Sequence, residues 1–461
     1  MSLVCLFQGD VVSHHALSCL ETNSKQSMHH RLQGGQVMFL GLILIGIGVV
    51  AWSMMLLLGQ RVHDMTSLHR AADAATYSAA LVQARALNMH AYLNRAQVAH
   101  QLGMAHLIAV ATAMQYRAKL GQQSQIRNPP ASLISAFFGP QYALSYATAS
   151  MGGMENTRSL QVLRNAYLRH ERQIHQVLSL VRQLQSSELA EQRKHAVQRM
   201  LVKNIGHSGQ AKRGDSLQQL GIKVSILMDE SEGLIQKRSG QDSTWRDFLN
   251  SLVDQSSFLK ERNQTKRNAW MINPRCPFKR HELRRRGRLT LGSDGQWRSE
   301  ETLSFHALRH NKFIGCYHRE YPMGWALLTT HNGDGLIGYT NEAQLPDFSR
   351  IAFWRWTRVQ GGPWNIFYGR HNPLAQRFGQ SESLKWSSKG LGEYAEISTS
   401  RVSQPVRISI QVSQKLDSGD SISTISSAQT YFESPKNSQA NQASLFEPYW
   451  HASLIPNPSL R

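Results

Sequence analysis

The chain has 461 residues, of which 41% are hydrophobic and 18% are charged, and its formal net charge is +20. This length corresponds to two or three ordinary domains, and the composition excludes a wholly disordered chain and a transporter with many spans. The positive charge favours anionic neighbours such as nucleic acid, lipid headgroups, a cell-wall polymer or an acidic protein. Four cysteines are too few for a disulfide scaffold.

A long uncharged segment near the N-terminus, residues 32–60, lies between Arg31 and Arg61. Its core, residues 37–58, is the 22-residue apolar run VMFLGLILIGIGVVAWSMMLLL. As an α-helix this run is about 33 Å long, close to the ~30 Å thickness of the hydrocarbon core of a bilayer. The apolar region of a cleaved signal peptide has only ~7–15 residues. We therefore predict a transmembrane signal-anchor at residues 32–60 in preference to a buried core helix.

The flanking charges do not decide the orientation of this segment, because two basic residues before it balance two after it. The short leader, residues 1–31, has no hydrophobic periodicity, and Met28 opens a compact basic stretch that runs straight into the apolar segment. Met28 is therefore a candidate for the natural start of the protein.

An alanine-rich segment follows, with 16 alanines among the 48 residues from 71 to 118 and no proline. Small and apolar residues recur along it at alternating steps of three and four, which is a heptad pattern. Small side chains let another helix approach closely, either from the same chain or from a second copy. Gln83 is expected to lie off this seam. The predicted helix-packing seam consists of Ala72, Ala75, Ala79, Val82, Ala86, Met89, Leu93 and Ala96.

A second helical stretch, residues 155–201, keeps the same alternation of apolar positions. It is separated from the first by a connection that contains Pro129 and Pro130, which end a helix. Residues 61–270 are therefore predicted to form a helical region, either a long hairpin or a small bundle.

The residues around the apolar segment resemble a known family. Gly35 and Gln36 before the apolar run, Gln60 after it, and the sequence AADAATYSAA at residues 71–80 resemble the N-terminal region of the Tad (Flp) pilus-assembly TadE/TadG-like family. The resemblance covers roughly residues 33–97, about a seventh of the chain. It implies a bitopic inner-membrane protein with a short cytoplasmic leader and a periplasmic body, associated with pilus or secretion machinery.

Two family features are absent from the sequence. Type IV-like pilins carry a glutamate soon after the processing glycine, whereas Gly35 is followed by the uncharged residues QVMFL. Some TadG-like proteins carry a von Willebrand factor A domain with an Asp-x-Ser-x-Ser metal site. Residues 417–421 read DSGDS, which does not match that spacing, so no such domain is predicted.

A basic segment from residue 262 to residue 288 contains ten Lys and Arg residues and one acid. Such a run is usually a solvated face. Binding of nucleic acid calls for interleaved stacking aromatics or a recognisable fold, so nucleic acid is not a predicted partner. Anionic lipid, cell wall or an acidic protein is the more natural target. The predicted basic patch is Arg284, Arg285, Arg286 and Arg288.

The sequence then changes to short runs of alternating apolar and polar residues, separated by turns. The clearest of these runs is residues 406–412 (VRISIQV), which is predicted to form a half-buried strand. Residues 331–335 (HNGDG) are predicted to form a hairpin turn between two apolar runs. Residues 271–461 are therefore predicted to be a β-rich extracytoplasmic domain. The predicted fold class is α+β: a single transmembrane helix, an Ala-rich helical hairpin or bundle, and a β-rich C-terminal domain.

The cysteines bear on compartment and on stability. Cys276 and Cys316 both follow the apolar segment and can close one disulfide in an oxidising compartment. By loop-entropy arguments such a bridge contributes ~3–4 kcal/mol. Cys5 and Cys19 precede the segment and would stay reduced in a cytosol.

Candidate chemistry is sparse. Residues 333–338 match G-x-G-x-x-G, but a strand leaving a turn is expected there, whereas dinucleotide binding needs a helix to start. The metal-like cluster His306, His310, Cys316 and His318 lacks the Glu of a zinc-protease helix. We therefore predict no catalytic residue, no metal and no cofactor.

The leading prediction is a non-enzymatic, membrane-anchored component of a Tad/Flp-like pilus-assembly or secretion system. It places the chain in the bacterial inner membrane as a single-pass protein, with the N-terminus in the cytoplasm and the C-terminal body in the periplasm. The predicted partners are the lipid bilayer, pilus-assembly or secretion proteins, and further copies of the chain. The alternative is a membrane-tethered protein that binds an anionic envelope polymer or lipid through the basic patch. A third hypothesis is a metal hydrolase around His306, His310 and His318.

Overall fold

A computed structural model describes residues 34–149, 156–205, 217–332, 371–398, 405–416, 419–435 and 443–456. These residues form a mixed α+β structure with 51% helix and 27% strand, as the sequence predicts at this level. The chain divides into two compact units, Met1–Asp64 and Met65–Arg461. The second unit is called the body.

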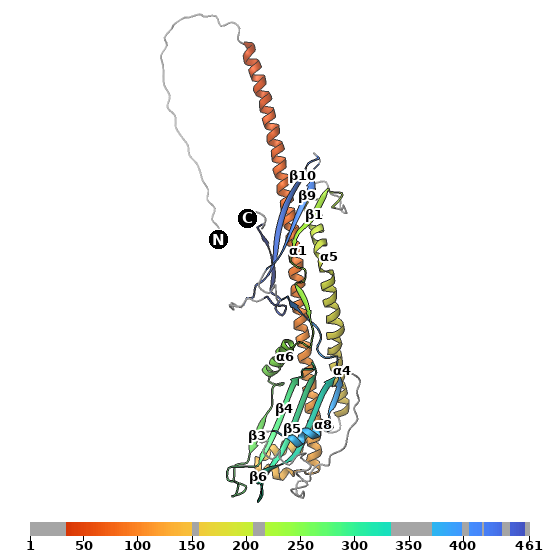
Figure 1. Cartoon of the computed structure of the whole chain (residues 1–461), viewed down its shortest axis with the longest axis vertical. Coiled ribbons are helices and arrows are strands. Elements are labelled where there is room, and N and C mark those ends of the chain that lie inside the picture. The colour runs from red at the N-terminus through yellow and green to blue at the C-terminus, as the bar shows by residue number, and fades with distance from the viewer. Residues whose placement is uncertain are drawn as a thin grey trace, which may run out of the picture. The chain divides into compact units, whose positions relative to one another are not determined.

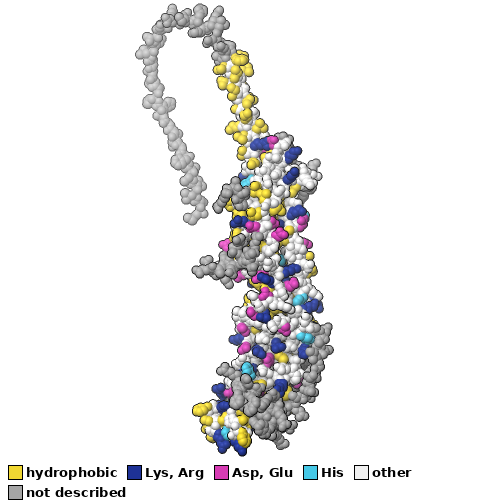
Figure 2. All heavy atoms as spheres, viewed as in Figure 1, with side chains coloured by type: hydrophobic (Ala, Val, Ile, Leu, Met, Phe, Trp, Pro, Cys, Tyr) yellow, Lys and Arg dark blue, Asp and Glu magenta, His cyan; other side chains and the backbone are white. Residues whose placement is uncertain are grey.

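The first unit holds the apolar stretch of helix α1 (Gly34–Gln125). Among the described residues, one helix is long and apolar enough to cross a membrane. This helix is α1, and it meets the criterion because it contains the apolar stretch. Its large side chains are exposed, from Met38 at 75% to Leu58 at 66%, and Figure 2 shows them as a band of hydrophobic atoms. Residues 1–33, which include the leader (residues 1–31) and the candidate start Met28, lie outside the described residues.

The body is built on the remainder of α1. After α2 (Ala131–Phe138) and α3 (Pro140–Thr148), the chain returns along α1 as α4 (Asn156–Arg172), a π-helical turn (Gln173–Leu178) and α5 (Ser179–Ile205). Near its start the body part of α1 packs against Leu201, and further on it packs against Tyr167. The two long helices are therefore antiparallel neighbours (Figure 1), and the body contains the predicted helical hairpin.

Three sheets lie on successive stretches of α1. The first is antiparallel, in the order β1 (Ile222–Asp229), β9 (Val406–Lys415), β10 (Ser421–Phe432) and β11 (Trp450–Ile455). The second pairs β2 (Ile235–Arg238) with β8 (Tyr394–Ile397). The third has the order β3 (Gln264–Arg267), β4 (Glu282–Leu291), β5 (Trp297–Asn311), β6 (Gly315–His331) and β7 (Leu384–Ser387), with only the last pair parallel.

Each sheet buries its apolar face against the helices. The first sheet packs Ile410 and Val412 on the start of the body part of α1. The third sheet packs Trp297 on the middle of α1 and Phe305 near its end. Helix α6 (Ser243–Gln255) joins the same core through Trp245, while α8 (Pro373–Ser381) covers β6.

The expected boundary between a helical region ending at residue 270 and a separate β-rich domain does not match this arrangement. Strands β1, β2 and β3 all precede residue 271, and β1 and β2 pair with strands from the far end of the chain. Ile222, for example, lies opposite Gln414. Short strands whose partners are distant leave little local signal, because their stability comes from cross-strand contacts.

The clearest predicted strand, residues 406–412, lies within β9. The hairpin turn predicted at residues 331–335 lies largely outside the described residues, as does the G-x-G-x-x-G match at residues 333–338.

Candidate functional site

The predicted basic patch is strand β4, and its arginines are divided between the two faces of the sheet. Successive side chains of a strand point to opposite faces, so Arg284, Arg286 and Arg288 share one face and Arg285 lies on the other. Arg284 is only 3% exposed. The predicted patch is therefore not a continuous exposed surface.

Carboxylates accompany these arginines. Nε of Arg284 donates to Oε2 of Glu282 at 2.7 Å. Arg288 lies opposite Glu300 on β5, with 3.7 Å between Nε and Oε2, and Arg285 lies 3.6 Å from Glu301. Burial opposes ionisation of Glu282, but Arg284, His318 and Arg267 together outweigh burial and lower the pKa of that carboxyl. The arginine run thus pairs with carboxylates, with Glu282 inside β4 and with Glu300 and Glu301 across to β5.

The arginine run is interrupted by a glycine, Gly287, because a side chain at this position would clash with a neighbour. A Cβ on Gly287 would lie 2.5 Å from Oε2 of Glu301, the residue opposite it on β5. Glu301 is 1% exposed, and its other oxygen accepts a hydrogen bond from Nε of Arg262 at 2.8 Å. Gly287 therefore makes room for a buried carboxylate that neutralises neighbouring cations.

A cleft of about 1100 Å³ lies over this strand. Its walls carry both signs of charge, so it is suited to a polar ligand and is not a purely cationic groove. The residues that line it are Glu261, Asn263, Thr265, Lys266, Arg267, Glu282, Arg286, Gly287, Arg288, Glu300, His371 and Gln376.

A buried carboxyl lies on the same face of the third sheet as Glu282, two strands away from β4. Glu320 on β6 is 1% exposed and accepts hydrogen bonds from the backbone N–H groups of Leu374 (2.8 Å) and Ala375 (3.0 Å) and from Oγ of Ser304 (2.8 Å). Burial raises the pKa of Glu320 to about 7, against the opposing effect of these hydrogen bonds. Its partners are the first turn of α8 and one hydroxyl, which makes Glu320 a cap that ties α8 to the sheet.

The residues of the metal-like cluster have other partners. His306 and His310 lie on strand β5, so they are not on a helix of the zinc-protease kind. Nε2 of His306 donates to Oδ1 of Asn372 at 3.0 Å, and burial together with Arg284 lowers the pKa of His306 well below its ordinary value. His318 bonds to the carbonyl of Arg280 at 2.8 Å. The described part of the chain holds no group of three or more His, Cys, Asp or Glu side chains that could bind a metal.

The predicted helix seam is buried at its start and drifts out of the interface. Ala72, Ala75 and Ala79 are 0% exposed, whereas Met89 is 37% exposed. Ala86 and Leu93 are buried, and Val82 and Ala96 are half-buried. The buried alanines pack within the chain, against residues of α5 and of the first sheet such as Leu201, Ile410 and Val412.

The drift follows from helix geometry. A straight α-helix has 3.6 residues per turn, so a strict heptad rotates by about 20° per repeat relative to it. The buried line on α1 instead repeats every five turns, as in the series Ala72, His90 and Ile108. It therefore passes through a row of polar side chains that the heptad missed, all at most 2% exposed: Gln83, His90, Asn94, Gln97 and Gln101.

Two residues of this polar row, Asn94 and Gln97, bind the backbone of the C-terminal half of the body. Nδ2 of Asn94 donates to the carbonyls of Ala395 (2.7 Å) and Leu445 (2.8 Å), and its Oδ1 accepts from the N–H of Ala395 (3.1 Å). Nε2 of Gln97 donates to the carbonyl of Gly392 at 2.7 Å. The row thus holds segments about 300 positions away in the sequence.

Arg182 on α5 completes the network. It donates to Oε1 of Gln97 at 3.0 Å and to the carbonyl of Glu393 at 2.6 Å, and burial lowers its pKa. Burial, together with Arg182, also lowers the pKa of His90 from 6.5 to about 4. The sequence did contain a signal for this row, because its polar residues recur on a helix face whose other residues are small or apolar. This pattern can be recognised only when the helix is read with a period of 3.6 residues.

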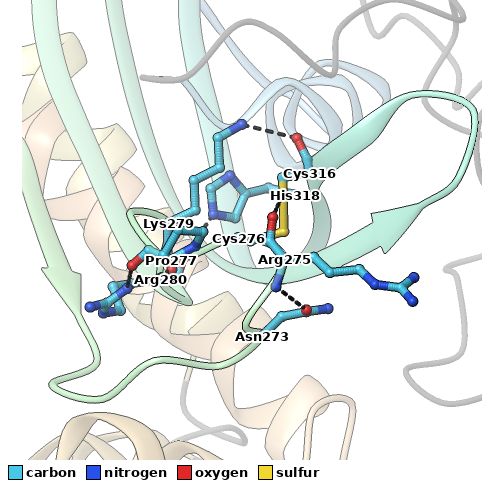
Figure 3. The surroundings of a disulfide bond; sticks show 8 residues. All are labelled: Asn273, Arg275, Cys276, Pro277, Lys279, Arg280, Cys316 and His318. Carbon is cyan, nitrogen blue, oxygen red and sulfur yellow. Dashed lines mark hydrogen bonds between the residues drawn. A yellow bond between two sulfur atoms is a disulfide. The ribbon is translucent and has the colours of Figure 1, made fainter.

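Cys276 and Cys316 form a disulfide in the structure, with 5.9 Å between their Cα atoms (Figure 3). The bond joins the loop before β4 to the start of β6. Nζ of Lys279 donates to the carbonyl of Cys316 at 2.9 Å, which adds a second link between the same two segments.

Comparisons with family models, curated proteins and solved structures found no match to this chain. A functional assignment therefore rests on the residues described above and on the resemblance of residues 33–97.

Proposed function

We propose that the chain is a non-enzymatic, membrane-anchored component of a Tad/Flp-like pilus-assembly or secretion system. In this proposal the apolar stretch of α1 crosses the inner membrane once, the leader lies in the cytoplasm and the body lies in the periplasm. The observation that carries the membrane part is the uncharged apolar stretch of α1 in residues 38–58, whose large side chains are exposed. The resemblance of residues 33–97 to TadE/TadG-like proteins supports the assembly part.

Two features of the body support this reading. The disulfide between Cys276 and Cys316 suits an oxidising compartment. The buried titratable groups Glu320 and His306 are engaged by the chain's own backbone and side chains, as expected of a structural network.

The topology is tested with reporters joined after Arg461. Alkaline phosphatase at this place is expected to be active, because it folds only outside the cytoplasm, and a green fluorescent protein that needs the cytosol is expected to stay dark. The reverse result, a bright fluorescent fusion with inactive phosphatase, would overturn the proposed orientation.

The assembly role is tested in the native cells. Genes for a secretion ATPase and a pilin are expected beside the gene for this chain, and deleting that gene is expected to abolish pili seen by electron microscopy. Normal pili in the deletion strain would refute the role. A complementing Glu320→Gln chain is expected to restore pili, because an amide oxygen can also cap a helix, whereas an enzyme that depended on this acid would stay inactive.

The alternative, binding of an anionic envelope polymer through Arg284, Arg285, Arg286 and Arg288, is less well supported. Ion pairs of these arginines with Glu282, Glu300 and Glu301 neutralise part of the charge it needs. It predicts that soluble polyphosphate binds the detergent-solubilised chain and that Arg288→Gln weakens this binding in a salt-dependent way. Unchanged binding in the variant would exclude this patch as the site.

A further inference from the structure

The disulfide joins two loops into one exposed tip. We define the stapled tip as residues 268–281 and 310–319, which Cys276 and Cys316 connect. Phe278 is 97% exposed and Phe313 is 78% exposed, the highest values among the large hydrophobic side chains of the described body. Figure 2 shows hydrophobic and basic side chains gathered at the end of the body, where the β5–β6 hairpin lies in Figure 1. Exposed aromatic rings on connected loops are unfavourable in water and mark a contact site.

The charge of the tip has one sign. Its two segments contain no Asp or Glu. Arg275, Lys279 and Lys312 are exposed, and Arg280 is half-buried. Nζ of Lys312 lies 4.9 Å from the centre of the Phe313 ring, so a cation and a protruding ring share one loop. In Figure 3 the Arg275 side chain extends away from the disulfide.

The tip is also held in shape by the body. Phe137 of α2 lies 5.7 Å from the ring of Trp270 and 4.5 Å from that of His281. With the disulfide and the bond from Lys279 to Cys316, these contacts fix both loops before any partner arrives. A preorganised surface loses little conformational entropy on binding.

We propose that the stapled tip binds the surface of an anionic lipid bilayer. Phe278 and Phe313 enter the headgroup region, and the Lys and Arg side chains contact lipid phosphates. Aromatic rings favour that interface because their apolar faces leave water, and each basic side chain near an anionic surface adds electrostatic attraction. A protruding pair of rings surrounded by cations matches a soft, negatively charged surface better than it matches a shaped protein groove.

This contact is distinct from the apolar stretch of α1 in residues 38–58. Along α1 the seam residue Ala75 and Leu120, which packs beside the sheet that carries the tip, are about 68 Å apart at ~1.5 Å per residue. The tip is therefore remote from the start of the body. The inference does not depend on a role in pilus assembly.

The test uses the full chain, with its apolar stretch held in phosphatidylcholine nanodiscs. Sucrose-loaded vesicles are added, made either of phosphatidylcholine alone or of a mixture with phosphatidylglycerol, and binding is measured by sedimentation. The wild-type chain is expected to sediment with the mixed vesicles, and added salt is expected to weaken this binding. Equal sedimentation with both kinds of vesicle would overturn the role of anionic lipid.

Paired variants locate the contact. Phe278→Ala with Phe313→Ala is expected to lower the affinity for mixed vesicles at least about tenfold, since two rings no longer leave water. Arg275→Gln with Lys312→Gln is expected to lower it about tenfold at low salt and to reduce its salt dependence. The matched control is Leu180→Ala with Leu184→Ala on α5, which removes two side chains that are 55% and 48% exposed and is expected to bind as the wild type does.

Two further outcomes would refute the proposal. If both tip variants, with unchanged thermal unfolding, bind vesicles like the wild type, the tip is not the lipid contact. If vesicles do not bind at all but crosslinking joins two chains through the tip, and Phe278→Ala with Phe313→Ala abolishes that product, the occupant is a second copy of the chain.

Discussion

Two stretches of the same face of α1 hold the body together by different means. From Leu68 to Ala80 the buried face consists mainly of alanines, which pack against apolar residues of α5 and the first sheet. From Gln83 to Gln101 the buried face also carries a row of four amides and one imidazole, and two of these amides, Asn94 and Gln97, bind backbone groups. The first stretch depends on close approach, and the second depends on satisfied hydrogen bonds.

The difference shows where each kind of contact is useful. Regular strands satisfy their own backbone groups, so the sheet over the alanines needs only shape and apolar area. The segments at Gly392 and Ala395 present carbonyl and N–H groups toward α1, and a buried backbone group without a partner costs about 1–3 kcal/mol. The polar row supplies those partners.

The largest expected effect is at Asn94. Asn94→Ala removes four hydrogen bonds, one of them from Arg182, and leaves backbone groups of Ala395 and Leu445 unpaired inside the protein. We expect the free energy of unfolding to fall by about 3–5 kcal/mol, measured by urea unfolding of the detergent-solubilised chain. Asn165→Ala on the exposed face of α4 is the control and is expected to change it by less than about 0.5 kcal/mol. Equal effects at both positions would show that the row does not carry the stability assigned to it.

The polar row should also make stability depend on pH. The pKa of His90 falls from 6.5 in the unfolded chain to about 4 in the folded protein. Between these values the unfolded chain binds a proton that the folded chain does not bind. The stability contributed by neutral His90 is therefore complete above about pH 6.5 and is lost as the pH falls toward 4, by roughly 2–3 kcal/mol.

Other histidines titrate in the same range, among them His281, whose pKa burial also lowers to about 4. The test therefore compares variants across the pH range. His90→Leu is expected to flatten the curve of unfolding free energy against pH, whereas His195→Leu, at a side chain that is 61% exposed, is expected to leave its shape unchanged. A curve that is equally steep in the His90 variant would assign the pH dependence elsewhere.

A smaller effect is expected in the alanine stretch. Ala79 is 0% exposed and has apolar neighbours on two elements, so Ala79→Leu overfills the contact. We expect a loss of about 1–3 kcal/mol, seen as a lower thermal midpoint of the single chain. Ala99→Leu, at an exposed alanine of the same helix, is the matched control. If Ala79→Leu instead leaves unfolding unchanged and disrupts crosslinked complexes, the stretch joins separate chains.

These contrasts also show what the sequence could reveal. The apolar stretch of α1 can be predicted from composition alone, because its length and its lack of charge define it. The alanine seam is predictable over Ala72 to Ala79, where a heptad and a straight helix still coincide, and fails by Met89, where they have diverged. The arginine run could be recognised in the sequence, but its pairing with Glu300 and Glu301 could not. That pairing depends on the register of two strands, which the arginine run alone does not determine.

The smallest expected effect lies at the junction of the two stretches and has the opposite sign. Gln83 was expected to lie off the seam, yet it is 2% exposed, and within the described residues neither its amide nitrogen nor its amide oxygen has a hydrogen-bond partner. A buried amide without partners is unfavourable. Gln83→Leu keeps a similar volume and is expected to leave stability unchanged or to raise it by up to about 1 kcal/mol. Gln97→Leu, which frees the Gly392 carbonyl, should lower stability in the same urea assay. A loss at Gln83 as large as that at Gln97 would mean that the Gln83 amide has hydrogen-bond partners in the folded protein, as the Gln97 amide has.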